Sequence, residues 1–440
     1  MIVLTHVCQT WREVFISRTS LWTDLDYVCT DKTLVYLERS KSSPITVSLR
    51  RDEVNGLLPI DPFFQITPSI IGRLKSLSIQ AVPWNMEGLI DQLSHPAPIL
   101  EDMGIDGESE DALEDNPVLE PTLFNGDLSS LRELRLKSVD TDLPWRNMAN
   151  LATFTFVGTE SVSLRQLLDF LENTSRLHEV KFHRVTLGSG LQEGRLISLP
   201  CLKRLVITVT NPSSILLEHL SIPAGAFLEA WVELPNPPVD GLPPRFLNNF
   251  KNLPNFTTIR LRCDGPTSCF RFTGPNREVQ INNSPFRRDN THFSLKSLAQ
   301  FDTAKAERLS VEFCNFPPLD LPYWVFLPMK NLRTLSLDRC RSLRFFIHAL
   351  DPTMNPSGVV VCPKLEEIVI FERGLFNFEH AMGMMAASRA LRGAKLKAVR
   401  IIDSRPDRER DPAGTLELRK HVCHVEFGPV RSAKSDGEEG

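Results

Sequence analysis

The sequence predicts an α/β fold in which short parallel strands, each followed by a return segment, stack side by side into a curved solenoid. Two observations lead to this prediction. One apolar phrase recurs at quasi-regular intervals between Leu74 and Leu396. Two segments outside that phrase, residues 31–41 and 163–173, carry apolar residues at helical spacing. Strands that alternate with helical or looping return segments are typical of a repeat array.

The recurring phrase is Leu-x-x-Leu-x-Leu or an apolar equivalent of it. Its clearest copies begin at Leu74, Leu100, Leu131, Leu151, Leu177, Leu202, Phe256, Ala306, Leu332, Leu365 and Leu396, and weaker ones lie near Phe227 and Val279. The first five steps are 26, 31, 20, 26 and 25 residues long. Steps of roughly 20 to 29 residues around this phrase are the signature of leucine-rich repeats, in which each unit adds one short strand. We therefore expect a leucine-rich-repeat-like solenoid over residues 21–427, with short parallel strands on its concave face.

The turn after each strand departs from the commoner pattern of such repeats, which places an Asn or Cys three positions after the last apolar residue of the phrase. That position holds Cys314 and Cys340 in two consecutive units, but Val139 and Val185 in others. No ladder of asparagine side chains is therefore expected. We interpret the two cysteines as buried structural thiols.

The composition excludes several classes of protein. Apolar residues make up 42% and charged residues 24% of the chain, as in ordinary globular proteins. No apolar run approaches the roughly 18 to 20 residues that span a membrane, and a net charge of -4 argues against a nucleic-acid-binding protein. The nine cysteines form no tight pairs, and the N-terminus lacks a basic region and a cleavage site. These features predict a cytoplasmic or nuclear protein with neither a membrane nor a nucleic acid among its partners.

The first residues of the chain carry a different pattern. Their apolar positions recur at the spacing of an amphipathic helix and are Leu4, Val7, Cys8, Trp11, Val14 and Phe15. A Leu-Trp pair, Leu21 and Trp22, follows. An apolar stripe of this kind must pack against something. It either binds a partner or covers the open end of the solenoid, since terminal repeats need a cap.

Two phrases in this region, VCQTWREV (7–14) and ISRTSLWTD (16–24), resemble the second half of an F-box, the three-helix module that binds a Skp-type adaptor. Phrases farther along, such as residues 416–427, are similar to those of F-box proteins with irregular leucine-rich repeats that are abundant in mushroom-forming fungi. An F-box ordinarily opens with a Leu-Pro phrase and a first helix, and this chain begins after both. We therefore expect a partial F-box over residues 1–20. The resemblance implies an adaptor-binding or capping role for Leu4, Val7, Cys8, Trp11, Phe15, Leu21 and Trp22.

The resemblance implies a substrate-recognition subunit of a cullin-type ubiquitin ligase, with a Skp-type adaptor and an unidentified target protein as its partners. The alternative is a free-standing leucine-rich-repeat scaffold that binds proteins without the adaptor. We expect no enzyme, cofactor or metal, because the sequence lacks a phosphate-binding loop, a dinucleotide fingerprint and a nucleophile elbow. The phrase HEVKFH (178–183) spaces its histidines five apart on a predicted strand, whereas a zinc protease needs them four apart on a helix.

Side chains that alternate with the buried ones on each strand should face the concave side and form the binding surface. The basic side chains predicted there are Arg135, Lys181, Arg204, Arg260, Arg262 and Arg308. Guanidinium groups suit carboxylates and phosphates, so we expect a target with an acidic or phosphorylated segment. The alternative is scattered charge on a solvated sheet.

Three further segments interrupt the pattern. Residues 101–120 carry nine acidic side chains, which predicts either a solvated loop or a docking site for a basic partner. Residues 235–245 contain five prolines and are expected to form a surface loop. The polar end, residues 428–440, is expected to be disordered.

Overall fold

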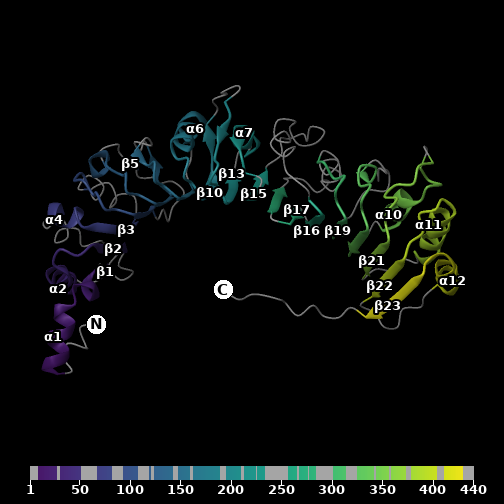
Figure 1. The fold of residues 1–440 in the computed structure, drawn as a ribbon, viewed down its shortest axis with the longest axis horizontal. Coiled ribbons are helices and arrows are strands. Elements are labelled where there is room, and N and C mark those ends of the chain that lie inside the picture. Colours follow the sequence, from purple (N-terminus) through teal and green to yellow (C-terminus); the bar gives the residue numbers. More distant parts are fainter. Residues whose placement is uncertain are drawn as a thin grey trace. The chain divides into compact units, whose positions relative to one another are not determined.

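The chain forms two compact units, Met1–Pro223 and Ala224–Gly440, in a computed structural model. Each unit is mixed α/β and is built on a large, mostly parallel sheet (Figure 1). The structure describes residues 8–26, 30–50, 67–81, 93–107, 118–119, 123–141, 147–158, 162–188, 195–209, 213–223, 225–232, 256–264, 267–275, 277–283, 301–313, 325–340, 343–355, 358–372, 378–403 and 411–429.

The sheet of the first unit follows the chain. Each strand pairs in parallel with the next one in the order β1, β2, β3, β4, β6, β8, β10 and β13. Every phrase predicted between Leu74 and Leu202 supplies one of these strands, and β1 and β2 precede them. The strands are β1 (Asp24–Asp26), β2 (Ile45–Arg50), β3 (Leu74–Ala81), β4 (Asp102–Gly107), β6 (Glu133–Lys137), β8 (Thr153–Val157), β10 (Glu179–Val185) and β13 (Arg204–Val209).

The alternation of apolar and polar residues decides which face of these strands is buried. In β8, for example, Phe154 and Phe156 are fully buried, whereas Thr153 and Thr155 between and beside them are only partly covered. Phe154 packs against Phe170 of α6, with 4.7 Å between the ring centroids. Full burial of each such ring contributes about 1.5–3 kcal/mol, which is why the helical return segments cover this face.

The predicted helices at 31–41 and 163–173 correspond to α2 and α6. In Figure 1, α6 and α7 lie on the same side of β10 and β13. The helices and the short 3-10 helices of the first unit are α1 (Gln9–Ser17), η2 (Thr19–Trp22), α2 (Thr30–Ser40), α4 (Thr67–Ile71), η3 (Leu123–Gly126), α6 (Leu164–Asn173) and α7 (Ser213–Glu218). Pairs of two-residue strands link the return segments and are β5 (Val118–Leu119) with β7 (Asp140–Thr141), β9 (Val162–Ser163) with β11 (Leu187–Gly188), and β12 (Ile197–Ser198) with β14 (Leu220–Ser221).

A repeated backbone turn ends several strands in place of an asparagine ladder. The residue after the strand has a positive φ at Ser138, Gly158, Phe313 and Arg339. Its N–H donates to a carbonyl of the next strand, as from Ser138 to Val157 at 2.7 Å and from Phe313 to Asp338 at 2.8 Å. The left-handed residue thus ties the end of one strand to the next strand through a backbone hydrogen bond.

The second unit departs from chain order. The strands pair in the order β15, β18, β17, β16, β19, β20, β21, β22 and β23, and β17 runs antiparallel to both of its neighbours. The strands β16, β17 and β18 therefore form a meander that is inserted in reverse order between β15 and β19. The bounds are β15 (Phe227–Val232), β16 (Thr258–Asp264), β17 (Thr267–Gly274), β18 (Arg277–Asn283), β19 (Arg308–Glu312), β20 (Thr334–Asp338), β21 (Glu367–Glu372), β22 (Ala398–Asp403) and β23 (His424–Pro429).

Helices α10, α11 and α12 belong to the described part of the second unit. In Figure 1, α11 and α12 lie side by side along β22 and β23. The fully buried Arg389 of α11 donates hydrogen bonds to the carbonyls of Val361 and Cys362, each at 2.8 Å. Burial lowers the pKa of Arg389 and raises that of the Cys362 thiol to about 12. The helices are α10 (Leu343–Leu350), α11 (Glu379–Leu391) and α12 (Pro412–His421).

One sequence-based expectation is wrong and others lie outside the described residues. Cys340 is only half-buried, because it lies in the turn after β20, where its thiol donates to the carbonyls of Val311 and Asp338. Cys314 lies outside the described residues. So do most of the acidic segment, the proline-rich segment at 235–245 and residues 430–440.

Candidate protein-binding surface

The helix α1 buries none of its residues against the described part of the chain. Trp11 is 49% and Val14 is 52% exposed, and the ring of Trp11 lies 5.6 Å from that of Phe15. Cys8 is exposed at the N-terminal end of the helix, and Leu4 and Val7 lie outside the described residues. Of the predicted apolar stripe, Cys8, Trp11 and Val14 are thus exposed, and Phe15 is half-buried.

Trp22 behaves in the opposite way and is fully buried. Its indole N–H donates a hydrogen bond to the carbonyl of Phe15 at 2.8 Å. Its ring packs edge-to-face with that of Tyr36, with 5.0 Å between the ring centroids. The guanidinium of Arg39 lies 4.4 Å from its ring centroid. Trp22 therefore anchors η2 to α2, while Leu21 beside it is half-buried. The residues predicted as one group divide into an exposed stripe on α1 and a buried anchor at Trp22.

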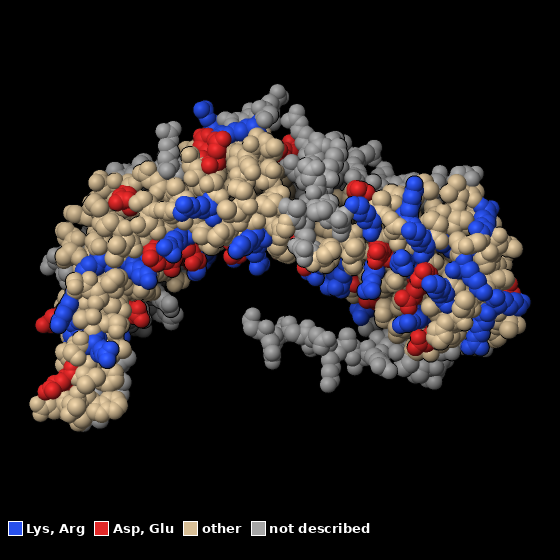
Figure 2. All heavy atoms as spheres, in the orientation of Figure 1, with Lys and Arg blue, Asp and Glu red and all other residues tan. Residues whose placement is uncertain are grey.

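On the sheet of the first unit, Arg135 and Arg204 are exposed and Lys181 is half-buried, and each lies beside a buried residue of its strand. Each has an acidic neighbour. Arg135 pairs with Glu133 on its own strand, and Glu179 lies 2.9 Å from Lys181 and 3.6 Å from Arg204. In Figure 2, acidic and basic side chains accordingly lie next to one another over these strands. The face is polar and locally neutralised.

Asp102, on β4 of the same sheet, has a carboxyl group with a shifted pKa. Partial burial, followed by the nearby Glu133, raises the pKa of Asp102. Ser76 on the neighbouring strand donates a hydrogen bond to it at 3.3 Å. That hydrogen bond and the nearby Arg135 lower the pKa of Asp102, but burial and Glu133 outweigh them.

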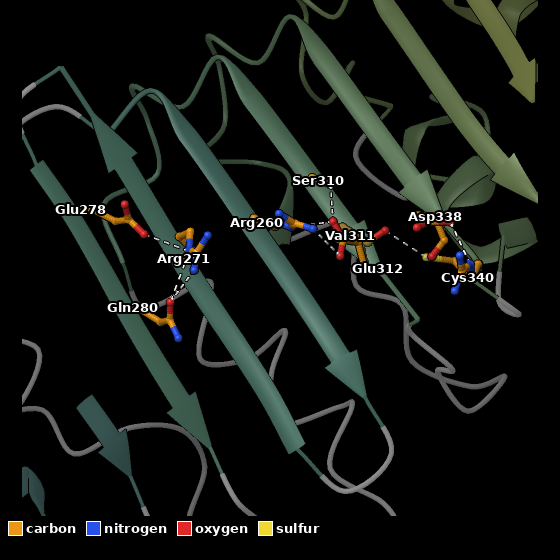
Figure 3. Close-up of polar contacts among 10 residues, drawn as sticks. Arg260, Arg271, Glu278, Gln280, Ser310, Val311, Glu312, Asp338 and Cys340 are labelled. Atoms are coloured by element: carbon orange, nitrogen blue, oxygen red, sulfur yellow. Dashed lines mark hydrogen bonds and ion pairs between the residues drawn. The ribbon is translucent and has the colours of Figure 1, made fainter. Parts of the chain in front are cut away.

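In the second unit, Arg260 and Arg262 on β16 and Arg308 on β19 are exposed and lie beside buried strand residues. Arg260 forms a two-pronged contact with Glu312 of the neighbouring strand, with distances of 2.5 and 2.9 Å from Nε and Nη2 (Figure 3). This hydrogen bonding is the main reason that the pKa of Arg260 is raised. Arg262 lies over the ring of Phe313, 5.4 Å from its centroid.

Sequence reasoning missed Arg271, which lies on β17. Its guanidinium reaches Glu278 at 2.9 Å and Gln280 at 2.8 Å, both on β18 (Figure 3). A chain of hydrogen bonds continues from Gln280 to Asn282 at 3.1 Å and from Asn282 to Glu229 at 3.3 Å. The alternation of SCFRFT (268–273), with Phe270 and Phe272 buried, was the signal that could have identified this strand.

Two arginine side chains, those of Arg262 and Arg339, lie over the ring of Phe313. Arg339 lies 4.7 Å from the same ring as Arg262, and 3.6 Å separate its Nε from Asp338. Trp231 on β15 is half-buried and donates to Glu229 at 3.3 Å. Arginine and aromatic residues are enriched at the energetic centres of protein–protein interfaces. The face of the second unit therefore has a composition suited to binding a protein.

The described residues contain no group of three His, Cys, Asp or Glu side chains arranged to hold a metal ion. Nor does any helix within the described ranges have the length and apolar character needed to cross a membrane. In comparisons with known proteins, the sequence matches no protein-family model and none of the curated proteins.

Proposed function

We propose that this chain is the substrate-recognition subunit of a cullin-type ubiquitin ligase, acting in the cytoplasm or nucleus. In this proposal α1 belongs to a partial F-box that docks on a Skp-type adaptor. The rest of the chain is a leucine-rich-repeat-like solenoid whose exposed strand face binds a target protein. The receptor positions the target, while its partner subunits carry out the chemistry.

The observation that carries the proposal is the exposed apolar stripe of α1. A helix that only capped the array would bury Trp11 and Val14 against the first strands. Both are instead about half exposed, and the buried anchor at this end is Trp22. An exposed Trp next to a Phe is the kind of surface that becomes the centre of a protein interface. This favours docking over the alternative of a free-standing scaffold.

The test is co-purification of a Skp-type adaptor with the full chain. We expect the wild-type chain to retain the adaptor. The double variant Trp11→Ala, Val14→Asp should retain at least tenfold less adaptor than the wild-type chain. Glu13→Ala is the matched control, because Glu13 lies on the opposite, polar side of α1, and it should retain the adaptor. A folded wild-type chain that retains no adaptor would overturn the proposal in favour of the scaffold.

A further inference from the structure

The strand β23 forms an outer edge of the sheet in the second unit. It pairs in parallel with β22, and no other strand in the described ranges pairs with it (Figure 1). His424 donates its backbone N–H to the carbonyl of Lys397 at 2.9 Å, so the N–H and C=O groups of His424 point toward β22. Since these groups alternate in direction along a strand, those of Val425 and Phe427 point to the open edge. Such an edge is a template for a further strand.

The apolar face of β23 is covered less completely than that of its neighbour. Val399 and Ile401 of β22 are buried, whereas their register partners Val425 and Phe427 are only half-buried. On α12, which leads into β23, Leu416 is 62% exposed. A unit of a repeat array buries its apolar face against the next unit. The edge at β23 therefore leaves apolar surface that a further strand would cover.

A second copy of β23 fits this edge in an antiparallel register that places Val425 opposite Val425 of the other copy. The two valines would exchange both backbone hydrogen bonds, because their N–H and C=O groups point outward on each copy. A two-fold axis through this pair relates the copies, which is the commonest symmetry of homodimers. An axis at Phe427 would instead place Val425 opposite Pro429, which has no N–H to donate. Hydrogen bonding therefore favours the register centred on Val425.

The same register brings complementary side chains together on the other face of the strands. His424 of each copy lies opposite Glu426 of the other, at a non-hydrogen-bonded pair, where opposed side chains are closest. These side chains are 66% and 54% exposed. Glu426 lies 3.5 Å from Arg400 of its own chain, and a carboxylate accepts hydrogen bonds from several donors at once. The two-fold axis repeats the contact, so the dimer contains two of them.

We propose that two copies of this chain associate edge to edge through β23. The occupant is a second copy because the hydrogen-bonding groups, the apolar side chains and the charged side chains of β23 are all self-complementary around Val425. The contact involves one short strand from each copy, and interfaces that bury less than about 1,200 Å² are typical of weak or transient association. The dimer therefore forms in a concentration-dependent manner. The inference is independent of the proposed function, which uses α1 of the first unit.

Sedimentation velocity of the full chain at rising concentration tests the inference, and we expect a shift from monomer to dimer. His424→Glu places two glutamates opposite each other at each contact, whereas Glu426→Lys replaces the acceptor of His424 with a further donor. Each variant alone should raise the dissociation constant at least about tenfold, because the two-fold axis repeats the unfavourable contact. An equimolar mixture of the two variants pairs opposite charges at both contacts and should recover the dimer.

His348→Glu is the matched control, because His348 is exposed on α10 of the same unit and undergoes the same change of residue. It should dimerise like the wild-type chain. A wild-type chain that stays monomeric at every concentration overturns the inference, as does a His424→Glu chain that dimerises as strongly as the wild type. A mixture of folded variants that fails to associate overturns the register.

Hydrogen exchange of the wild-type chain gives a test that needs no variant. The outward N–H groups of Val425 and Phe427 become hydrogen-bonded in the dimer, so exchange in a peptide of residues 424–429 should slow as the concentration rises. Exchange in peptides of β20, which has paired strands on both sides, should stay unchanged. A dimer that leaves exchange at 424–429 unaltered would place the interface elsewhere and overturn the inference.

Discussion

At the scale of single residues, the turns after the strands depend on the left-handed conformation. Gly158 has a φ of 68°, and a Cβ built on it would lie 3.3 Å from the hydroxyl oxygen of Ser138. An L-residue in this conformation costs roughly 1–2 kcal/mol. We therefore expect Gly158→Ala to lower the free energy of unfolding by about 1–2 kcal/mol in denaturant titrations.

Gly225→Ala is the control for this substitution. No atom lies within 4 Å of a Cβ built at Gly225, and its φ is outside the left-handed range. Its effect should stay within about 0.5 kcal/mol, as is usual for a surface change. Equal effects of the two substitutions would show that backbone conformation does not limit the turn at Gly158.

The buried Arg389 gives a second prediction at this scale. Its guanidinium is the hydrogen-bond donor for the carbonyls of Val361 and Cys362, and Cys362 has a positive φ of 47°. Arg389→Leu would leave these acceptors unpaired, at a cost of about 1–3 kcal/mol for each buried group. We expect a marked drop in the thermal unfolding temperature. Arg392→Leu changes an exposed arginine of the same segment, and a drop as large as that of Arg389→Leu would contradict this account.

At the scale of elements, the N-terminal helix and the 3-10 helix after it have different roles. Trp22 is fully buried, so Trp22→Ala should destabilise the chain by about 3–5 kcal/mol. Trp11→Ala should cost less than about 0.5 kcal/mol, because Trp11 makes no buried contact with the described residues. Denaturant titration of both variants separates docking from capping, since a capping helix would show a large loss at Trp11.

The meander shows how far an element can be predicted from local sequence. The phrases at Phe256 and Val279 predicted β16 and β18, because both alternate apolar and polar residues. The strand between them was missed, although Phe270 and Phe272 alternate with polar residues in the same way. The reason is that β17 does not carry the phrase of the repeat.

At the scale of the whole molecule, the described strands of the first unit's main sheet, such as β4, β6, β8 and β10, pair with one another in chain order. In such a quasi-one-dimensional array, the effect of a core change decays with distance along the stack. We expect Leu134→Ala in β6 to cost about 2–5 kcal/mol and to speed amide hydrogen exchange most in β4, β6 and β8. Amide exchange of peptides from β20 to β23, measured by mass spectrometry in the same variant, is the reference and should change less than exchange in β4, β6 and β8. A uniform increase in both units would instead indicate a single cooperative transition.

The sequence by itself determined where most strands lie and which of their side chains are buried. It could do so because alternation is local, and the exposed placement of Arg135, Arg204, Arg260, Arg262 and Arg308 and the half-buried placement of Lys181 follow from it. Only the tertiary structure decided that Arg271 is opposite Arg260, since strand order depends on contacts between distant segments. It likewise decided that Trp22 is buried while Trp11 is exposed. The two residues lie in neighbouring phrases of the sequence, and the burial of each one depends on what it packs against.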